Sequence, residues 1–261
     1  MEGAQTSATV IAVTNQKGGV GKTTTAINLA FYLAKADKRV LLIDFDPQGN
    51  ATSGLGVEKA GLTHTILDVV SEVVALGDVI STTNFKNLDL VPATAALANA
   101  EPGLAKAEHR FVRLRNAVNS VAENYDYIII DSPPSLGLLT INGLIAAQYV
   151  LLPVQAEFYA LEGLTQLLET MQLVRKQLNP TLELLGVLVT MMDGRTTLSG
   201  QVYEEVAKHF PGKVFETKIP RNVRLAEAPS HGLPAGAYDR FSKGAKAYKA
   251  AAKEVMERTN K

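Results

Sequence analysis

The chain has 261 residues, of which 46% are hydrophobic, and it carries 26 basic and 26 acidic side chains. The hydrophobic content is sufficient for a buried core, and the lack of cysteine excludes disulfide frameworks, thiolate metal sites and iron–sulfur clusters. The sequence shows neither a secretory signal nor an apolar run of about 18 residues, as a membrane helix requires, so we expect a cytoplasmic protein.

The first predicted elements surround a glycine-rich loop. We expect residues 1–9 to form a disordered extension and residues 10–258 to form a single domain, which opens with a strand at 10–14 and continues with a helix at 22–36. The loop between them reads Lys17-Gly18-Gly19-Val20-Gly21-Lys22-Thr23-Thr24. Glycines allow successive backbone N–H groups to point into one concavity, and the positive end of the helix dipole favours an anion there. This strand, loop and helix therefore predict a phosphate-binding site.

The loop departs from the usual phosphate-loop pattern. Lys22 is the expected contact to the β- and γ-phosphates, and Thr23 is the expected hydroxyl ligand of Mg²⁺. The usual pattern, Gly-x-x-x-x-Gly-Lys-Ser/Thr, has its first glycine where this sequence has Gln16, and a second lysine, Lys17, opens the loop. The glycine loop is therefore a deviant form of the phosphate-loop motif. The amides of Asn15 and Gln16 either contact phosphate or magnesium-bound water, or make ordinary turn hydrogen bonds.

Two later strands end in carboxylates. The strand predicted at 39–44 ends at Asp44, close to the glycine loop if the two strands are neighbours, where a carboxylate could orient an attacking water or hold a metal-bound water. The strand predicted at 126–131 ends at Asp131. An apolar strand followed by Asp is the Walker B arrangement, in which the carboxylate reaches Mg²⁺ through water. Two prolines follow, and Ser135 is the expected N-cap of the next helix.

Short apolar runs and helical patterns alternate along the rest of the chain. Further strands are expected at 88–91, 148–153 and 183–190, and further helices at 104–123, 136–146, 160–178 and 199–210. Continuous Ile, Val and Leu runs indicate strands that are covered on both faces. The sequence therefore predicts an α/β fold with a doubly wound, mostly parallel sheet and helices on both faces, which binds ligands at the carboxyl ends of its strands.

The C-terminal part of the chain is basic. Residues 213–253 hold nine Lys or Arg and three acidic residues, which indicates either a binding face or an ordinary solvated helix face. Pro220 and Asn222 could flank and hydrogen-bond an adenine. Candidate contacts to a phosphate backbone are Arg195, Arg221, Arg224 and, in a helix expected over 241–258, Lys243 and Lys246. Arg221 and Arg224 would share a helical face if their segment is helical.

Four segments together carry a resemblance to a known family. They are residues 17–24, 42–50, 129–134 and 219–224. Through them the sequence resembles, over nearly its whole length, the ParA family of partition ATPases, and more narrowly the chromosomal Soj group. These proteins are P-loop NTPases of the deviant Walker A class.

The resemblance implies a reaction in which ATP lies between two subunits. Lys17 reaches the phosphates of the partner subunit, and Lys22 holds phosphates within its own subunit. Thr23 ligates Mg²⁺, Asp131 supports the magnesium shell, and Asp44 helps to activate the hydrolytic water.

The resemblance also implies partners. The positions of Pro220 and Asn222 adjoin the base of ATP. The ATP-bound homodimer binds double-stranded DNA without sequence preference, with Arg195 and Arg224 as candidate contacts and the lysines of the last helix as additions. A ParB-type partner protein stimulates hydrolysis and so releases the DNA. The expected location is the nucleoid, with no membrane partner.

Three other readings remain open at this point. A MinD-like, membrane-associated positioning ATPase shares the loop, but it should end in an amphipathic membrane helix, whereas the apolar side of 241–258 is small and rich in alanine. A reductase resembling the nitrogenase iron protein would need cluster cysteines, and the sequence has none. A purely structural or filament-forming protein would not need Lys22, Thr23 and Asp44 together.

Overall fold

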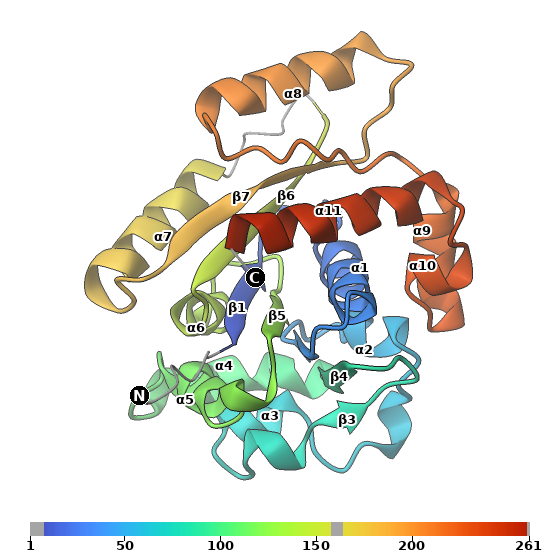
Figure 1. Ribbon diagram of the computed structural model, residues 1–261. Coiled ribbons are helices and arrows are strands. Elements are labelled where there is room, and N and C mark those ends of the chain that lie inside the picture. The colour runs from blue at the N-terminus through green and yellow to red at the C-terminus, as the bar shows by residue number, and fades with distance from the viewer. Residues whose placement is uncertain (1–7, 158–163, 260–261) are drawn as a thin grey trace, which may run out of the picture.

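The computed structural model describes residues 8–157 and 164–259, and its centre is a seven-stranded sheet with the order β3-β4-β2-β5-β1-β6-β7 (Figure 1). Six strands run parallel: β1 (Thr9–Val13), β2 (Val40–Asp44), β4 (Leu88–Val91), β5 (Tyr127–Asp131), β6 (Tyr149–Gln155) and β7 (Glu183–Thr190). A short edge strand, β3 (Ser81–Thr82), pairs antiparallel with β4 and lacks a signal in the sequence. The predicted doubly wound, mostly parallel sheet is confirmed.

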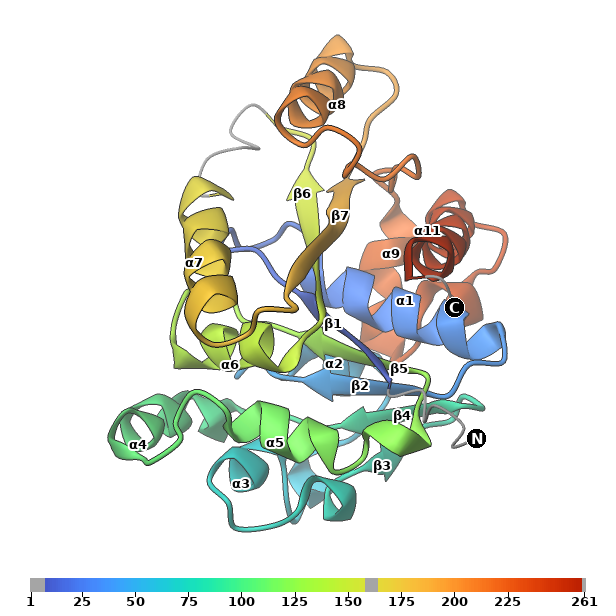
Figure 2. The same cartoon turned by 60° about the vertical axis from the view of Figure 1, so that its left-hand side comes forward.

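Helices cover both faces of the sheet (Figure 2). Two of them, α1 (Lys22–Lys35) and α11 (Lys243–Thr259), pack on one face. The helices of the other face are α3 (Ile66–Val70), α4 (Ala100–Lys106), α5 (Arg113–Asn119), α6 (Leu138–Ala146), α7 (Leu164–Gln177) and α8 (Thr197–His209). The short helices α2 (Asn50–Gly54), α9 (Val223–Glu227) and α10 (Ala235–Tyr238) lie in the connections. None of the helices in the described ranges is long and apolar enough to cross a membrane.

Alternate side chains of the central strands enter opposite cores. In β5, Ile128 and Ile130 join the cluster under α3 to α8, whereas Ile129 joins the cluster under α1 and α11, and all three are fully buried. This alternation explains why the strand reads as a continuous apolar run, because both of its faces are covered.

The prediction of one helix over 104–123 is wrong, because the chain forms two helices, α4 and α5, with a break between them. His109 in the break has a φ of 57°, in the left-handed region. Asn142 of α6 supports the break: its Nδ2 donates to the carbonyl of Arg110 at 2.8 Å, and its Oδ1 accepts from the N–H of Leu114 at 3.4 Å. A buried side chain from another helix thus satisfies backbone groups that a continuous helix would pair internally.

The other predicted boundaries agree with the structure within about two residues. The assignment of Ser135 as an N-cap is wrong, because Gly137 occupies that position in front of α6. Residues 1–7 of the expected extension and 160–163 of an expected helix lie outside the described residues. Ala8 is fully buried, and β1 begins at the next residue.

The position of β5 between β1 and β2 assembles the functional edge of the sheet. Asp131 at the end of β5 is in register with Val13 of β1 on one side and with Asp44 of β2 on the other. The two strands that were considered as possible neighbours, β1 and β2, are separated by β5. Because all three strands are parallel, the glycine loop and both carboxylates still leave the sheet at the same edge.

Candidate functional site

The glycine loop joins β1 to α1 through two residues in the left-handed region. Gly19 has a φ of 75°, and Gly21, the N-cap of α1, has a φ of 89°. Within the described chain, no heavy atom of a neighbouring segment lies within 4 Å of a Cβ built on Gly18 or Gly19, so the loop is open to a ligand. Lys22 is only 6% exposed, and its Nζ donates to the carbonyl of Lys17 at 3.1 Å. The curled backbone and the buried ammonium together form a cradle for a polyanion.

The carboxylate of Asp131 is fully buried beside this loop. Neither of its oxygens has a hydrogen-bond partner in the described part of the chain. Burial raises the pKa of Asp131 well above its usual range, the charge of Asp44 raises it further, and Thr23 and Lys22 oppose the shift. Burial also lowers the pKa of Lys22, against the attraction of Asp131. An unpartnered buried carboxylate destabilises a fold, so this group points to a cationic ligand.

Magnesium fits this set of donors. Mg²⁺ in proteins is usually held by one or two carboxylates, water and the phosphates of the substrate rather than by a full cage of side chains. Across residues 8–157 and 164–259, no group of three or more His, Asp or Glu could hold a metal alone. Asp131 and the hydroxyl of Thr23 would therefore hold Mg²⁺ together with ligand oxygens, and the ion would neutralise charge on the phosphates.

The carboxylate of Asp44 is equally buried but is hydrogen-bonded. Its Oδ2 accepts two bonds of 2.7 Å, from the backbone N–H and from the hydroxyl of Thr52 in α2. Its Oδ1 accepts from the N–H of Asp46 at 3.3 Å. Burial raises the pKa of Asp44 to about 6, and the hydrogen bonds from Thr52 oppose that shift. Thr52 was not predicted from the sequence, since a threonine eight residues after Asp44 carries no periodic or motif signal.

Two cavities meet at the glycine loop. The first, of about 320 Å³, lies over the loop and extends to Gln48 and to Pro134. The second, of about 220 Å³, shares Gly21, Thr24 and Met191 with the first. A ligand with an anionic end and an apolar, aromatic end would fill both cavities at once.

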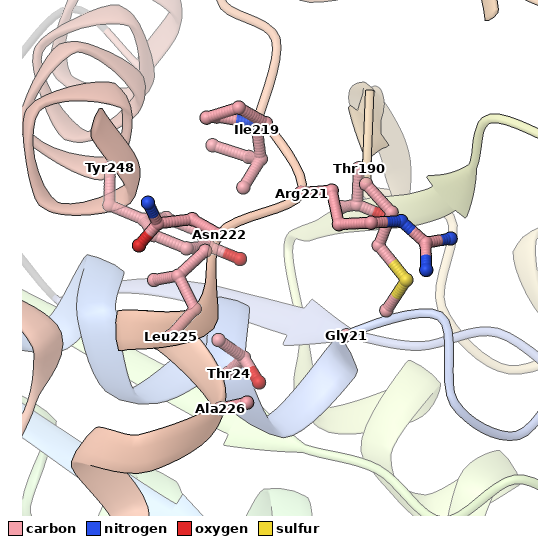
Figure 3. A pocket seen from close by; sticks show the side chains of 11 residues that line it. Gly21, Thr24, Thr190, Ile219, Arg221, Asn222, Leu225, Ala226 and Tyr248 are labelled. Carbon is pink, nitrogen blue, oxygen red and sulfur yellow. The ribbon is translucent and has the colours of Figure 1, made fainter. Parts of the chain in front are cut away.

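The second cavity holds the two residues that were predicted to contact a base. Pro220 and Asn222 line it, and the buried Oδ1 of Asn222 has no hydrogen-bond partner in the described ranges (Figure 3). Tyr248 of α11 also lines it, and its hydroxyl shares a hydrogen bond of 3.0 Å with the hydroxyl of Thr25 in α1. A free amide acceptor in a mostly apolar pocket suits the exocyclic amino group of adenine. The contribution of Tyr248 to this pocket was not predicted from the sequence.

The two amides in front of the glycine loop differ in their surroundings. The Nδ2 of Asn15 donates to the carbonyl of Pro153 at 2.8 Å, and its Oδ1 accepts from the N–H of Lys17 at 3.0 Å. Of the two alternatives left open, the turn interpretation thus applies to Asn15. The buried Nε2 of Gln16 has no partner in the described segments, so this amide is the one that remains available to a ligand.

Lys17 lies at the rim of the site, with 39% of its side chain exposed. Its Nζ is 3.7 Å from Oε2 of Glu157, and Oε1 of Glu157 is 4.0 Å from a guanidinium nitrogen of Arg221. Glu157 was not predicted as a site residue, although its carboxylate lies between the predicted site residues Lys17 and Arg221. Exposed ion pairs contribute only about 0–1 kcal/mol, so Lys17 is held weakly within its own subunit.

The arginines predicted to contact a phosphate backbone have carboxylate neighbours. Arg195 pairs with Asp193 at 2.7 Å, and Arg224 pairs with Glu227 at 2.7 Å. Arg221 precedes α9, and its guanidinium points away from Asn222 in Figure 3. Because Arg221 lies outside α9, the condition under which Arg221 and Arg224 would share a helical face is not met.

The predicted lysines lie on α11, away from the base-binding cavity. Lys246 lines a separate groove between α1 and α11, together with Tyr32, Lys35 and Lys249. Lys243 is the first residue of α11. The five basic candidates thus belong to five different surroundings. These are a loop before α8 for Arg195, the second cavity for Arg221, α9 for Arg224, the first residue of α11 for Lys243 and the α1–α11 groove for Lys246.

Asp131→Asn is expected to stabilise the ligand-free protein and to weaken the binding of Mg²⁺. The raised pKa of Asp131 means that its carboxyl destabilises the folded state at pH 7 relative to the unfolded state, in which the carboxylate is hydrated. An amide has no charge to desolvate, so the gain in stability should be on the order of 1–3 kcal/mol. Because the folded-state pKa of Asp131 is raised, the stability difference should shrink as the pH falls towards the pKa of an unfolded Asp. Thermal unfolding in EDTA at pH 7 and pH 5 measures this effect. A variant that is less stable than the wild type at both values would contradict it.

Comparisons with known proteins support the geometric interpretation. A protein-family model described as an AAA domain matches residues 8–184. The sporulation initiation inhibitor protein Soj of Bacillus subtilis is 58% identical over 94% of this chain and 97% of its own length. The chromosome partitioning protein ParA of Myxococcus xanthus is 51% identical, over 95% of this chain and 88% of its own length.

A solved structure extends the comparison to the fold. Cobyrinic acid a,c-diamide synthase from Mycobacterium smegmatis, with bound ADP and magnesium, is 37% identical with a TM-score of 0.86, over 97% of this chain and 96% of that one. The site geometry and the comparisons point to the same family. The geometry consists of the deviant glycine loop and the two carboxylates at the strand ends. The chain belongs to the ParA/Soj family of chromosome-partitioning ATPases.

Proposed function

We propose that this protein hydrolyses ATP with the help of Mg²⁺ and uses the ATP-bound state as a switch in DNA partitioning. The observation that carries the proposal is the buried Asp131 carboxylate, which has no partner among the described residues and lies next to Lys22 and the glycine loop. Such a group is stabilised by the cation that accompanies nucleotide phosphates. The relatives named Soj and ParA, and the neighbour that holds ADP and magnesium, support the same conclusion. Residues 10–258 act as a single domain in this proposal.

The nucleotide would occupy both cavities. The loop N–H groups and Lys22 bind the β- and γ-phosphates, while Asn222 accepts a hydrogen bond from adenine. Thr23, and Asp131 through water, hold Mg²⁺. Asp44 orients the water that attacks the γ-phosphorus, so that the bond to the bridging oxygen breaks and ADP and phosphate form.

Lys17 would make the nucleotide site one that two subunits share. Its side chain stands at the rim and its ion pair with Glu157 is exposed, so it is free to contact the phosphates of a second subunit. Two subunits would then enclose two nucleotides, and dimerisation would depend on ATP because each nucleotide contributes to the interface.

The ATP-bound dimer would bind double-stranded DNA without sequence preference, in the nucleoid. A single chain has no net charge, so it should bind weakly, whereas a dimer presents each basic group twice. Arg195, Arg221, Arg224, Lys243 and Lys246 are the proposed contacts. Each of the three arginines would exchange its carboxylate partner, such as Glu227 for Arg224, for a DNA phosphate. A ParB-type partner would stimulate hydrolysis, which ends the dimeric state and releases the DNA.

The membrane-associated alternative receives less support. Its anchor would need an apolar helix face near the C-terminus, but the apolar residues of α11 are buried against α1, including Tyr248, Ala252 and Val255. The exposed stripe of α11 carries lysine instead. Co-sedimentation with liposomes and with DNA, each with and without ATP, separates the two proposals.

The purified protein should hydrolyse ATP slowly alone, and DNA together with a ParB-type partner should raise the rate several-fold above either addition alone. The reason is that hydrolysis is proposed to depend on the DNA-bound dimer and on a second protein. A steady-state phosphate-release assay with the four combinations measures this effect. A high rate without DNA or partner, unchanged by either, would contradict the switch.

Lys17→Ala should abolish ATP-dependent dimerisation and reduce hydrolysis to background, because the contact across the interface is lost. Size-exclusion chromatography with light scattering, with ATP and Mg²⁺, measures the oligomeric state. The matched control is Glu157→Ala, which breaks the same intrasubunit ion pair but keeps the lysine. Equal loss of dimer in both variants would assign the effect to that ion pair rather than to a contact with the partner subunit.

Arg224→Glu should weaken DNA binding by about 10-fold or more at low salt and leave ATP affinity unchanged, because it replaces a phosphate contact by a like charge. Fluorescence anisotropy with a DNA duplex, repeated at several salt concentrations, should also show a shallower salt dependence. Lys86→Glu is the matched control, since it makes the same charge change in the exposed turn between β3 and β4. DNA affinity equal to that of the wild type in Arg224→Glu would remove Arg224 from the interface.

A further inference from the structure

The hydroxyl of Thr52 joins three segments of the chain. It lies 2.7 Å from Oδ2 of Asp44 at the end of β2, and 2.9 Å from the backbone nitrogen of Ala93, after the end of β4. A backbone N–H can only donate, so the hydroxyl accepts from Ala93 and its own hydrogen is directed at the Asp44 carboxylate. Thr52, Asp44 and Ala93 are all fully buried, so no water competes for these bonds.

The two carboxylate oxygens of Asp44 therefore accept hydrogen bonds of different number and length. Oδ2 receives two short bonds, from the N–H and the hydroxyl of Thr52, both at 2.7 Å. Oδ1 receives one long bond of 3.3 Å, from the N–H of Asp46. Hydrogen bonds to an ionised acceptor are among the stronger ones in proteins, so Oδ2 acts as the anchor of the carboxylate. Oδ1 keeps the capacity to accept another hydrogen bond.

The segment between Asp46 and Thr52 is also held close to the strand ends. Gly49 has a φ of 63°, and a Cβ built on it would lie 2.6 Å from the carbonyl oxygen of Ala93. Asp46, Gln48 and Asn50 of this segment line the cavity over the glycine loop. The backbone of Ala93 thus donates a hydrogen bond to Thr52 and lies close to Gly49, in the segment that forms one wall of that cavity.

We propose that Thr52 is a positioning residue for ATP hydrolysis. It holds Oδ2 of Asp44 in place, so that Oδ1 is directed to the attacking water. The inference rests on the proposed function, in which Asp44 orients that water. Thr52 itself does not contact the nucleotide or the water, and its effect is transmitted through Asp44 alone.

Thr52→Val tests the inference, since valine has nearly the shape of threonine and lacks the hydroxyl. The backbone N–H bond to Asp44 remains in this variant. We expect kcat to fall by about 10-fold or more, because even a small misplacement of a catalytic group slows the chemical step. KM and ATP affinity should change by less than about 2-fold. Thr52→Ser restores the hydroxyl and should retain kcat within about 3-fold of the wild type. A wild-type kcat in Thr52→Val, or an equal loss in Thr52→Ser, would overturn the proposal.

A double-variant cycle separates positioning from general destabilisation. Single-turnover hydrolysis of labelled ATP is measured in Asp44→Ala and in Asp44→Ala combined with Thr52→Val. If Thr52 acts through Asp44, the double variant hydrolyses ATP no more slowly than Asp44→Ala. A further loss equal to that of Thr52→Val alone would refute the coupling. If Thr52→Val does not fold, as judged by thermal unfolding, Thr52→Ala replaces it in the same cycle.

The same cycle distinguishes two kinds of failure. Slow hydrolysis in Asp44→Ala together with normal hydrolysis in Thr52→Val overturns the role of Thr52 and leaves the proposed function intact. Normal hydrolysis in Asp44→Ala overturns the role of Asp44 in the proposed function, and the positioning role of Thr52 is overturned with it.

Discussion

The burial of two carboxylates at one edge of the sheet is the constraint on which the rest of this structure depends. Asp44 and Asp131 end neighbouring strands in register, and both are excluded from water. Each charge raises the free energy of the other, and neither would be tolerated without compensation. Asp44 receives hydrogen bonds from Thr52, whereas Asp131 has no hydrogen-bond partner among the described residues. In the proposed function, one carboxylate is thus positioned by the protein itself, and the charge of the other is compensated by the cation that accompanies the nucleotide.

The fold could be predicted from the sequence to the extent that local signals determine it. Continuous apolar runs such as Ile128–Ile130 marked the strands, because strands covered on both faces need them. The glycine loop was recognisable because left-handed backbone positions require glycine, as Gly21 illustrates. The break between α4 and α5 was not predictable, since Asn142, the residue that supports it, lies in another helix. The order of the strands, which separates β1 from β2, also depends on packing rather than on local pattern.

The residues of the candidate site also fall into two groups, those that sequence motifs predict and those that only the fold brings together. Lys22, Thr23 and Asp131 were found because they belong to motifs with fixed spacing. Thr52 and Glu157 were missed because their roles come from contacts that the fold creates, with partners that no periodic pattern connects to them. The charge count over residues 213–253 could not decide between a binding face and a solvated helix face, because it contains no information on which charges lie together. The structure pairs Arg224 with Glu227, one of the three acids in that count, and pairs Arg195, outside the counted segment, with Asp193.

The pocket beside Asn222 has a consequence for the way the protein is made. Its walls come from Gly21 and Thr24 at one end of the chain and from Tyr248 at the other, and the hydrogen bond between Thr25 and Tyr248 spans 223 residues. During synthesis the glycine loop leaves the ribosome long before α11 does, because translation proceeds at only about 5–20 residues per second. An incomplete chain that lacks α11 therefore lacks one wall of this pocket. In the proposed function, a nucleotide would be held at both ends only after almost the entire polypeptide has been synthesised, so the proposed switch requires a nearly complete chain.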